Sequence, residues 1–322
     1  MNKTSTYLFV VAGVALVGAL ALVWVFWRQH GTSVEYPMAV ATDIPTTVAV
    51  GPKGEVWFTI DFSDAVGVIR DGRLQRITKP GRNVEPIGLA VDASGTAWFT
   101  DPAAIAITGI TPDGKLSSFP LGTPIARLAR LAAAPDGAVW FAEATGYSFT
   151  RLKDGTLTRH TIESVRGGPY GVTVAADGTV WGTLQAGNQL TRIGPAGDMT
   201  DYELPTRASS PTDVAVDHDG TVWVVEFRGN KLARFADGKF TEYPLPDGKS
   251  APSGIAAAPD GSIWFGVLRG AALGRVRDGK MRFFALPRDN ARPYSVAVDQ
   301  QGNVWYADIT GYVGMISAAR AR

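Results

Sequence analysis

The chain has 322 residues, of which 45% are hydrophobic and 19% charged, so it can bury a large core and is not intrinsically disordered. Its 31 basic and 30 acidic side chains nearly cancel, which excludes nucleic acid as a partner attracted by overall charge. The lack of cysteine excludes disulfides and thiol catalysis, and 37 glycines and 20 prolines favour short strands joined by tight turns.

The first predicted element is a membrane-spanning helix over residues 7–27, which contain no charged side chain. At about 1.5 Å per residue this helix would be roughly 31 Å long, the thickness of a bilayer core. Trp24 and Trp27 lie near its end, where an interfacial aromatic belt is expected. We therefore expect a single-pass protein of the inner (cytoplasmic) membrane, with residues 1–6 in the cytoplasm.

A cleaved signal peptide is the alternative reading of this segment, because residues 19–21 (ALA) resemble a small-residue cleavage site. Cleavage there would leave an apolar N-terminus, so we favour a retained anchor. Residues 28–33 would be a short linker, and the rest of the chain would lie on the periplasmic, extracytoplasmic side. Because a few extended residues span at most about 20 Å, the following domain must lie close to the bilayer.

Tryptophan recurs along the remaining chain at steps of 41 or 42 residues, at Trp57, Trp98, Trp140, Trp181, Trp223, Trp264 and Trp305. Each repeat contains four short β-runs separated by Asp-Gly or Gly-Asn turns, which is typical of antiparallel hairpins. A period of this length with strand patterns throughout predicts a propeller. We therefore expect an all-β, seven-bladed β-propeller over residues 34–318, with the tryptophans packed between blades, followed by a frayed tail at residues 319–322.

The closure of the ring is predicted from a strand that the last repeat lacks. The seventh unit ends at Arg322 without an outer strand, whereas residues 34–38 (VEYPM) match the outer strand at residues 241–245 (TEYPL). Tyr36 also precedes Trp57 by the same 21 residues that separate the other outer-strand residues from the next tryptophan. The N-terminal strand should therefore complete the last blade, which removes exposed sheet edges.

Four repeat elements resemble those of the virginiamycin B lyase (streptogramin lyase) family: residues 252–256 (PSGIA), 140–143 (WFAE), 229–234 (GNKLAR) and 242–246 (EYPLP). The resemblance extends from about residue 33 to residue 318 and implies a propeller fold. It also implies an activity, since the family's lyases are soluble enzymes that open a cyclic depsipeptide antibiotic by Mg²⁺-assisted elimination. Those enzymes use histidines just after the proline that opens a blade, together with nearby glutamates.

This chain departs from that pattern at the histidines. The corresponding positions hold Thr46, Ile87, Ala129, Tyr170, Thr212, Ser253 and Tyr294. Glu85 does precede a blade-opening proline, but the histidine is missing there too. The only histidines are His30, beside the anchor, and His160 and His218, for which we expect solvated positions on the surface.

Carboxylates recur three residues after the repeated tryptophan, at the end of the second strand of a unit: Asp101, Glu143, Glu226 and Asp308. Because a hairpin's first strand starts where its second ends, these residues should meet the blade-opening prolines at one rim. Oxygen ligands suit Mg²⁺ or Ca²⁺, so these four acids are candidate metal ligands. The alternative, which we favour, is that the ancestral repeat had Glu at this position and that these acids hydrogen-bond to local backbone turns. The other three units have apolar residues there, so we do not expect a regular cage of ligands.

Two functions remain open. The first is a non-catalytic binding or scaffold module without a cofactor, an accessory subunit that binds other proteins of a membrane complex of the respiratory or photosynthetic type. Its ligand-binding rim would comprise Arg127, Arg292, Tyr170 and Tyr294. The second is a Mg²⁺-dependent lyase or lactone hydrolase that uses Glu85, Glu143 and Glu226, with Tyr170 or Tyr294 as proton donor. We favour the first because the family's histidines are missing.

Overall fold

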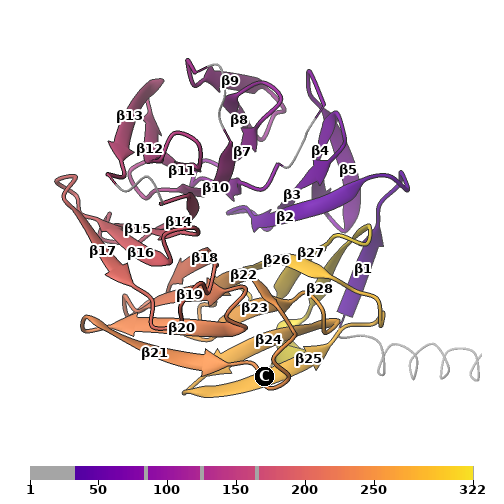
Figure 1. Ribbon diagram of the computed structural model, residues 1–322. Coiled ribbons are helices and arrows are strands. Elements are labelled where there is room, and N and C mark those ends of the chain that lie inside the picture. Colours follow the sequence, from indigo (N-terminus) through magenta and orange to yellow (C-terminus); the bar gives the residue numbers. More distant parts are fainter. Residues whose placement is uncertain (1–32, 83–85, 124–126, 164–166, 322) are drawn as a thin grey trace, which may run out of the picture.

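The computed structural model describes residues 33–82, 86–123, 127–163 and 167–321, which form a closed ring of seven four-stranded antiparallel sheets (Figure 1). The prediction of an all-β, seven-bladed propeller is confirmed. The expected anchor at residues 7–27 and the candidate Glu85 lie outside the described residues. Within those residues, no helix is both long and apolar enough to span a bilayer.

Each blade contains four strands that are consecutive in the sequence, except the last. Blades 1 to 3 are β2 (Ile44–Val50), β3 (Val56–Asp61), β4 (Ala65–Arg70), β5 (Arg73–Thr78); β6 (Leu89–Val91), β7 (Ala97–Asp101), β8 (Ala106–Ile110), β9 (Leu116–Pro120); and β10 (Leu128–Ala133), β11 (Val139–Glu143), β12 (Ser148–Lys153), β13 (Thr156–Thr161). Blades 4 and 5 are β14 (Pro169–Val174), β15 (Val180–Leu184), β16 (Gln189–Ile193), β17 (Met199–Glu203); and β18 (Pro211–Val216), β19 (Val222–Glu226), β20 (Lys231–Ala236), β21 (Lys239–Pro244). Blades 6 and 7 are β22 (Pro252–Ala257), β23 (Ile263–Val267), β24 (Ala272–Arg277), β25 (Lys280–Ala285); and β26 (Pro293–Val298), β27 (Val304–Asp308), β28 (Tyr312–Ile316), β1 (Ser33–Pro37).

The first strand of each blade lies next to the propeller axis, and its direction defines two faces of the ring. The first strands begin on what we call the mouth face, where Pro211 pairs with Glu226 in blade 5. They end on the opposite face, which we call the turn face, where the Asp219-Gly220 turn joins β18 to β19. Gly220 has a φ of 79°, which glycine adopts without the steric penalty of a side chain.

The N-terminal strand closes the ring as predicted, one residue earlier than expected. β1 pairs with β28 from Ser33 opposite Ile316 to Pro37 opposite Tyr312. Since β28 runs from the mouth face to the turn face, the antiparallel β1 starts on the turn face. The expected frayed tail is instead a helical turn, α2 (Ala318–Ala321), whose Arg320 donates a hydrogen bond to the carbonyl of Ala285 at 2.9 Å.

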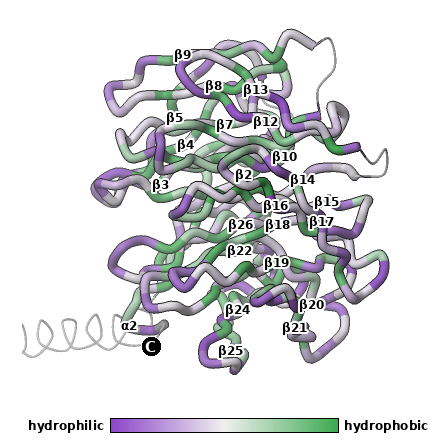
Figure 2. The backbone as a smooth tube through the Cα atoms, turned by 90° about the vertical axis from the view of Figure 1, so that its left-hand side faces the viewer, coloured by the Kyte–Doolittle hydropathy of each residue, from purple (hydrophilic) through white to green (hydrophobic). Residues whose placement is uncertain are grey.

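The hydrophobic core lies between blades, as the tryptophan spacing predicted. Trp305 of blade 7 packs with Val48 and Phe58 of blade 1. An outer-strand ring covers six of the seven indoles, as Tyr36 covers Trp305 with their centroids 6.2 Å apart, whereas Trp57 has Ile77 at that position. Figure 2 shows hydrophobic residues along the strands and hydrophilic residues gathered at the turns. Burial between sheets therefore holds the inner strands rigidly around the axis.

Candidate functional site

A small pocket lies at the propeller axis on the mouth face and is the strongest candidate site. Its volume is about 130 Å³, and inner-strand residues of blades 3 to 7 contribute to its lining. The lining residues are Arg130, Tyr170, Gln185, Thr212, Phe227, Ser253, Gly254 and Tyr294. We call this cavity the mouth pocket.

The floor of the mouth pocket is an ion pair across the axis. Arg130 of blade 3 places Nη2 3.5 Å from Oδ2 of Asp213 in blade 5, and the two side chains are only 9% and 13% exposed. Arg130 Nη1 also donates to the Thr47 hydroxyl and the Ile87 carbonyl, both at 3.5 Å. Its guanidinium lies 5.6 Å from the centre of the Tyr294 ring. One arginine thus connects five blades and separates the pocket from a cavity of about 250 Å³ farther along the axis.

Arg130 and Asp213 occupy the position that is glycine in the Pro-x-Gly start of blades 2, 4 and 6. At Gly254 that glycine is required, because a Cβ there would lie 2.7 Å from the Cα of Ser295 in the next inner strand. Sequence reasoning missed both charged residues as site residues. The signal was available, since an arginine and an aspartate replace a repeat glycine within otherwise apolar inner strands.

Burial governs the electrostatics of this pair. Burial raises the pKa of the Asp213 carboxyl, although Arg130 and the backbone amides of Val214 and Ile255 act in the opposite direction. Burial is also the largest influence on Arg130 and by itself would lower its pKa, but Asp213, Tyr294 and Tyr170 together outweigh burial and raise the pKa. Because each charge is already matched by the other, the pair leaves no free carboxylate for a ligand at the floor of the pocket.

Tyr170 and Tyr294, two of the predicted rim residues, meet above the ion pair. Their hydroxyl oxygens are 3.4 Å apart, within reach of a hydrogen bond in either direction. Burial, with Tyr294 as the next cause, raises the pKa of Tyr170 well above its usual range. Tyr170 therefore stays protonated and can donate a hydrogen bond, but it cannot act as a base near neutral pH.

Arg127 and Arg292, the other two predicted rim residues, are exposed at the mouth face. The backbone N–H of Arg127 donates to the Thr145 hydroxyl at 2.9 Å, and that of Arg292 donates to Oδ1 of Asp308 at 3.0 Å. Both backbones are thus fixed while the guanidinium groups remain available to a partner. The mouth face therefore combines a small aromatic pocket with two exposed arginine side chains, Arg127 and Arg292.

The four predicted metal ligands are separated from one another and buried between blades. Asp101 pairs with Lys79 at 2.9 Å, Glu143 with Arg159 at 3.2 Å, and Asp308 with Arg288 at 2.5 Å. Each carboxylate ends its strand near the mouth face, as the pairing of Pro293 with Asp308 shows for blade 7. For Asp101, Glu143 and Asp308 the cation comes from an outer strand or a link between blades, however, so these side chains point between the sheets. No three metal-ligating side chains gather anywhere in the described ranges.

Glu226 differs from the other three because no cation reaches it. Neither carboxylate oxygen has a hydrogen-bond partner, and the residue is fully buried. Lys231, which lies opposite it in the sheet, instead binds Glu242 at 2.7 Å. Burial, followed by the neighbouring charge of Glu242, raises the pKa of Glu226 to about 7.

The two described histidines lie away from the mouth pocket. His160 is half-buried rather than solvated, because its ring packs against Trp140 with centroids 5.0 Å apart. Burial and the nearby Arg151 lower its pKa. His218 lies in an exposed turn, as expected, with Nε2 3.3 Å from Asp219. In the part of the chain that the structure describes, no histidine lines the mouth pocket.

The mouth pocket does not fit the Mg²⁺ ion that the family resemblance implies. Its side-chain donors are one arginine and neutral hydroxyl and amide groups, and the nearby Asp213 is held by Arg130. Mg²⁺ in proteins is usually held by one or two carboxylates together with water. The described residues therefore favour binding through hydrogen bonds and aromatic contact over metal coordination.

Comparison with known proteins shows which family this propeller resembles. The model of the virginiamycin B lyase family matches residues 27–154 and 124–321. A virginiamycin B lyase from Nocardia farcinica is 36% identical over 163 residues, which cover 50% of this chain and 56% of that protein. The match thus spans about half the length of this curated relative.

Two solved structures are similar over nearly their whole length. A streptogramin B lyase is 26% identical with a TM-score of 0.84, over 88% of this chain and 97% of that chain. A catalytically inactive histidine-to-alanine variant of virginiamycin B lyase from Staphylococcus aureus, with quinupristin, has the same identity and TM-score over 88% and 98%. In that relative, replacing one histidine accompanies loss of catalysis.

Proposed function

The chain belongs to the virginiamycin B lyase family, and from that premise we propose that it is a non-catalytic binding module on the outer side of the membrane. It would be an accessory subunit of a membrane protein complex and would hold its partner at the mouth face. The observation that carries this proposal is the mouth pocket itself. There Arg130 and Asp213 close the axis, and the described residues bring no histidine to it.

The position of β1 supports a tether on the side away from the mouth. Ser33 pairs with Ile316 at the turn face, so any anchor that precedes Ser33 joins the ring there. A helix at residues 7–27 would then point the mouth face away from the bilayer. Tyr170, Tyr294, Arg127 and Arg292 would be presented to a partner, and aromatic and arginine side chains are the ones enriched at protein interfaces.

The test is purification of the tagged full-length chain from membranes in mild detergent, followed by mass spectrometry of co-purifying proteins. We expect a defined partner that is lost with Arg127→Glu/Arg292→Glu and retained with Lys153→Glu, an exchange on the opposite face of blade 3. Both variants change exposed or half-exposed side chains, so folding should be unaffected. Recovery of a monodisperse monomer, or a partner that is insensitive to the mouth variant, would contradict the proposal.

A lyase or lactone hydrolase is the second candidate, and the Tyr170–Tyr294 pair favours it. The two hydroxyls lie at the axial mouth, and Tyr170 remains a proton donor. A relative with quinupristin has the same fold. Asp101, Glu143 and Asp308 are engaged by cations, so no step through Mg²⁺ or Ca²⁺ is included.

Incubation of the full-length chain with quinupristin decides between the two candidates. We expect no ring-opened product by mass spectrometry under conditions in which a virginiamycin B lyase converts the compound. Product formation that is lost with Tyr170→Phe/Tyr294→Phe would establish the enzyme instead.

A further inference from the structure

The hairpin of β24 and β25 in blade 6 has the highest net positive charge of the outer hairpins that the structure describes. It lies next to the start of β1. It has four basic residues and one acidic residue, namely Arg275, Arg277, Lys280, Arg282 and Asp278. The corresponding hairpin of blade 4, β16 and β17, has one basic residue and three acidic residues. Figure 1 shows β17 on one side of the ring and β25 on the other, close to β1. The outer hairpins of blades 6 and 4 therefore carry opposite net charge.

The basic hairpin of blade 6 lies beside the blade through which the chain enters the propeller. Arg288, which follows β25, binds Glu35 of β1 at 3.0 Å. Arg320 of α2 is bound to the carbonyl of Ala285 at the end of β25. Ser33 begins β1 at the turn face of the adjoining blade 7. A tether before Ser33 would thus bring the blade 6 hairpin closer to the bilayer than the blade 4 hairpin.

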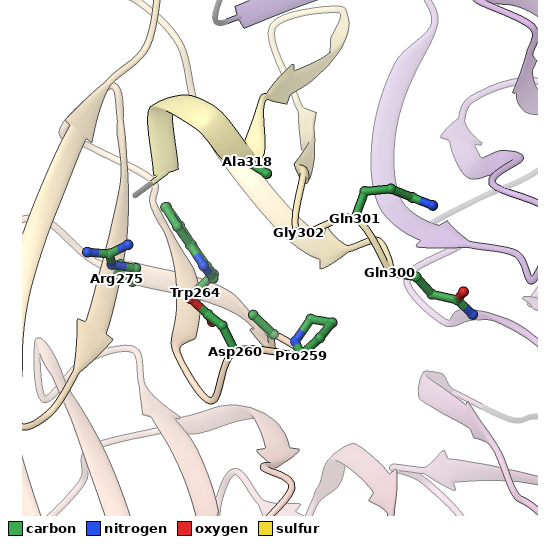
Figure 3. Close-up of a pocket in the computed structure, with 9 residues that line it drawn as sticks. Pro259, Asp260, Trp264, Arg275, Gln300, Gln301, Gly302 and Ala318 are labelled. Atoms are coloured by element: carbon green, nitrogen blue, oxygen red, sulfur yellow. The ribbon is translucent and has the colours of Figure 1, made fainter.

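A groove between blades 6 and 7 lies at the turn face, and one of these basic residues, Arg275, lines it. Its volume is about 270 Å³, and Figure 3 shows Trp264, Arg275 and Asp260 on the blade 6 side and Gln300 and Gln301 on the blade 7 side. The Arg275 guanidinium lies 5.6 Å from the centre of the Trp264 ring. Burial and the positive charges of Arg277 and Arg282 lower the pKa of Arg275, although Asp260 opposes them. Crowded cations of this kind are stabilised by an added anion.

An exposed aromatic ring lies on the same outer strand, on its other side. Phe283 is 38% exposed, and it occupies a position at which the other six outer strands have a polar residue, such as Glu242 in blade 5. Its ring packs edge-on against the buried Phe265, with the two ring centroids 6.3 Å apart. Aromatic rings beside basic side chains are typical of surfaces that lie on a membrane interface.

We propose that Arg275, Arg277, Lys280, Arg282 and Phe283, the blade 6 patch, bind the anionic headgroups of the bilayer that holds the chain. The basic side chains contact phosphate groups, and Phe283 enters the interfacial layer. This inference rests on the membrane tether of the proposed function. It fixes the tilt of the propeller, with the turn face of blades 6 and 7 nearest the lipid and the mouth face directed outward.

A single fluorescent label tests this contact, because the chain has no cysteine of its own. The full-length Asp278→Cys variant carries a polarity-sensitive dye at the exposed Asp278, in the turn that joins β24 to β25 at the turn face. It is placed in nanodiscs of phosphatidylcholine alone or mixed with phosphatidylglycerol. We expect a blue shift of the emission only with the anionic lipid, and its loss when salt reduces the Debye length to about 3 Å.

Controls in blades 4 and 5 separate a specific contact from general proximity. The same dye at Ala196→Cys, an exposed turn of blade 4, should not shift. Arg277→Gln/Lys280→Gln/Arg282→Gln should weaken binding to anionic vesicles more than about tenfold. Lys280→Gln alone should weaken binding to anionic vesicles measurably, whereas Lys239→Gln at the matching position of blade 5 should not.

The outcomes distinguish the patch from the tether. A label at residue 278 that does not shift, or shifts equally in both lipids, would overturn the blade 6 patch as an anionic-lipid contact. If the chain does not enter nanodiscs, the tether is wrong. The lipid contact of the patch is then tested by adding anionic vesicles to the labelled protein in solution and measuring the same shift of the emission. A shift that appears only with a co-purified acidic protein would assign the patch to that partner and also overturn the lipid contact.

Discussion

Arg130 and Asp213 face each other across the propeller axis, 3.5 Å apart, from blades that are not neighbours in the ring. Asp213 also accepts hydrogen bonds from the backbone amides of Val214 and Ile255, at 3.0 and 3.2 Å. Through the pair, the inner strands of blades 3, 5 and 6 are linked by polar contacts. These contacts hold Arg130 and Asp213 in place beneath the mouth pocket.

Replacing Arg130 with methionine should lower the free energy of unfolding by about 3 kcal/mol, because the buried Asp213 loses its charge partner. The double variant Arg130→Met/Asp213→Asn should recover more than half of that loss, since neither position then holds an unpaired charge. Thermal unfolding of both variants in mild detergent measures the difference. Equal losses in the single and double variants would show that the arginine acts through packing alone.

Arg288 should be the main side-chain contact that holds the closing strand. It binds Asp308, which is fully buried, at 2.5 Å and Glu35 of β1 at 3.0 Å. Arg288→Met leaves two carboxylates near each other without a cation, so we expect a loss of about 3 kcal/mol. Hydrogen exchange of the β1 amides should accelerate. Arg277→Gln, which breaks the half-exposed pair with Asp260, should cost less than about 1 kcal/mol and leave β1 protected.

The blades and their closure could be predicted because the repeat itself contains the information. The tryptophan period gives the number of blades, and the match between residues 34–38 and 241–245 gives the strand that closes the ring. Tyr170 and Tyr294 could be placed at the mouth because each follows a blade-opening residue that pairs with the end of the second strand. Backbone register is thus a property of the repeat.

The side-chain partners could not be predicted because they come from outside the repeat pattern. Lys79 and Arg288, which bind Asp101 and Asp308, lie in links between blades that differ in sequence. The repeat alone therefore makes those carboxylates look like free metal ligands. The Arg130–Asp213 contact depends on the width of the ring, which is set by the packing of all seven blades.

Glu226 should make stability depend on pH. Its pKa is about 7 in the folded protein against an unperturbed 4.5, so the folded state binds the proton more tightly than the unfolded state. The cost of ionising Glu226 is absent below pH 4.5, grows as pH rises and is complete above pH 7, where it reaches about 3 kcal/mol. Glu226→Gln should remove this decline, so that the variant is the more stable protein at pH 8 but not at pH 5. Parallel pH profiles of the urea midpoint for both proteins would contradict the assignment.

Ala134 leaves the indole N–H of Trp140 without the acceptor that other blades supply. An aspartate six residues before the tryptophan accepts that hydrogen bond in blades 2, 5 and 7: Asp92 to Trp98 at 2.8 Å, Asp217 to Trp223 at 3.1 Å and Asp299 to Trp305 at 3.2 Å. A groove of about 560 Å³ beside Ala134 and Trp140 has room for the missing carboxylate. Ala134→Asp should therefore raise the free energy of unfolding by about 1 kcal/mol, the net value of one hydrogen bond. The indole proton of Trp140 should move downfield in the NMR spectrum, while Ala134→Leu, which fills space without an acceptor, should produce neither change. A melting temperature that is unchanged or lower in Ala134→Asp would show that the repeat's aspartate does not stabilise this blade.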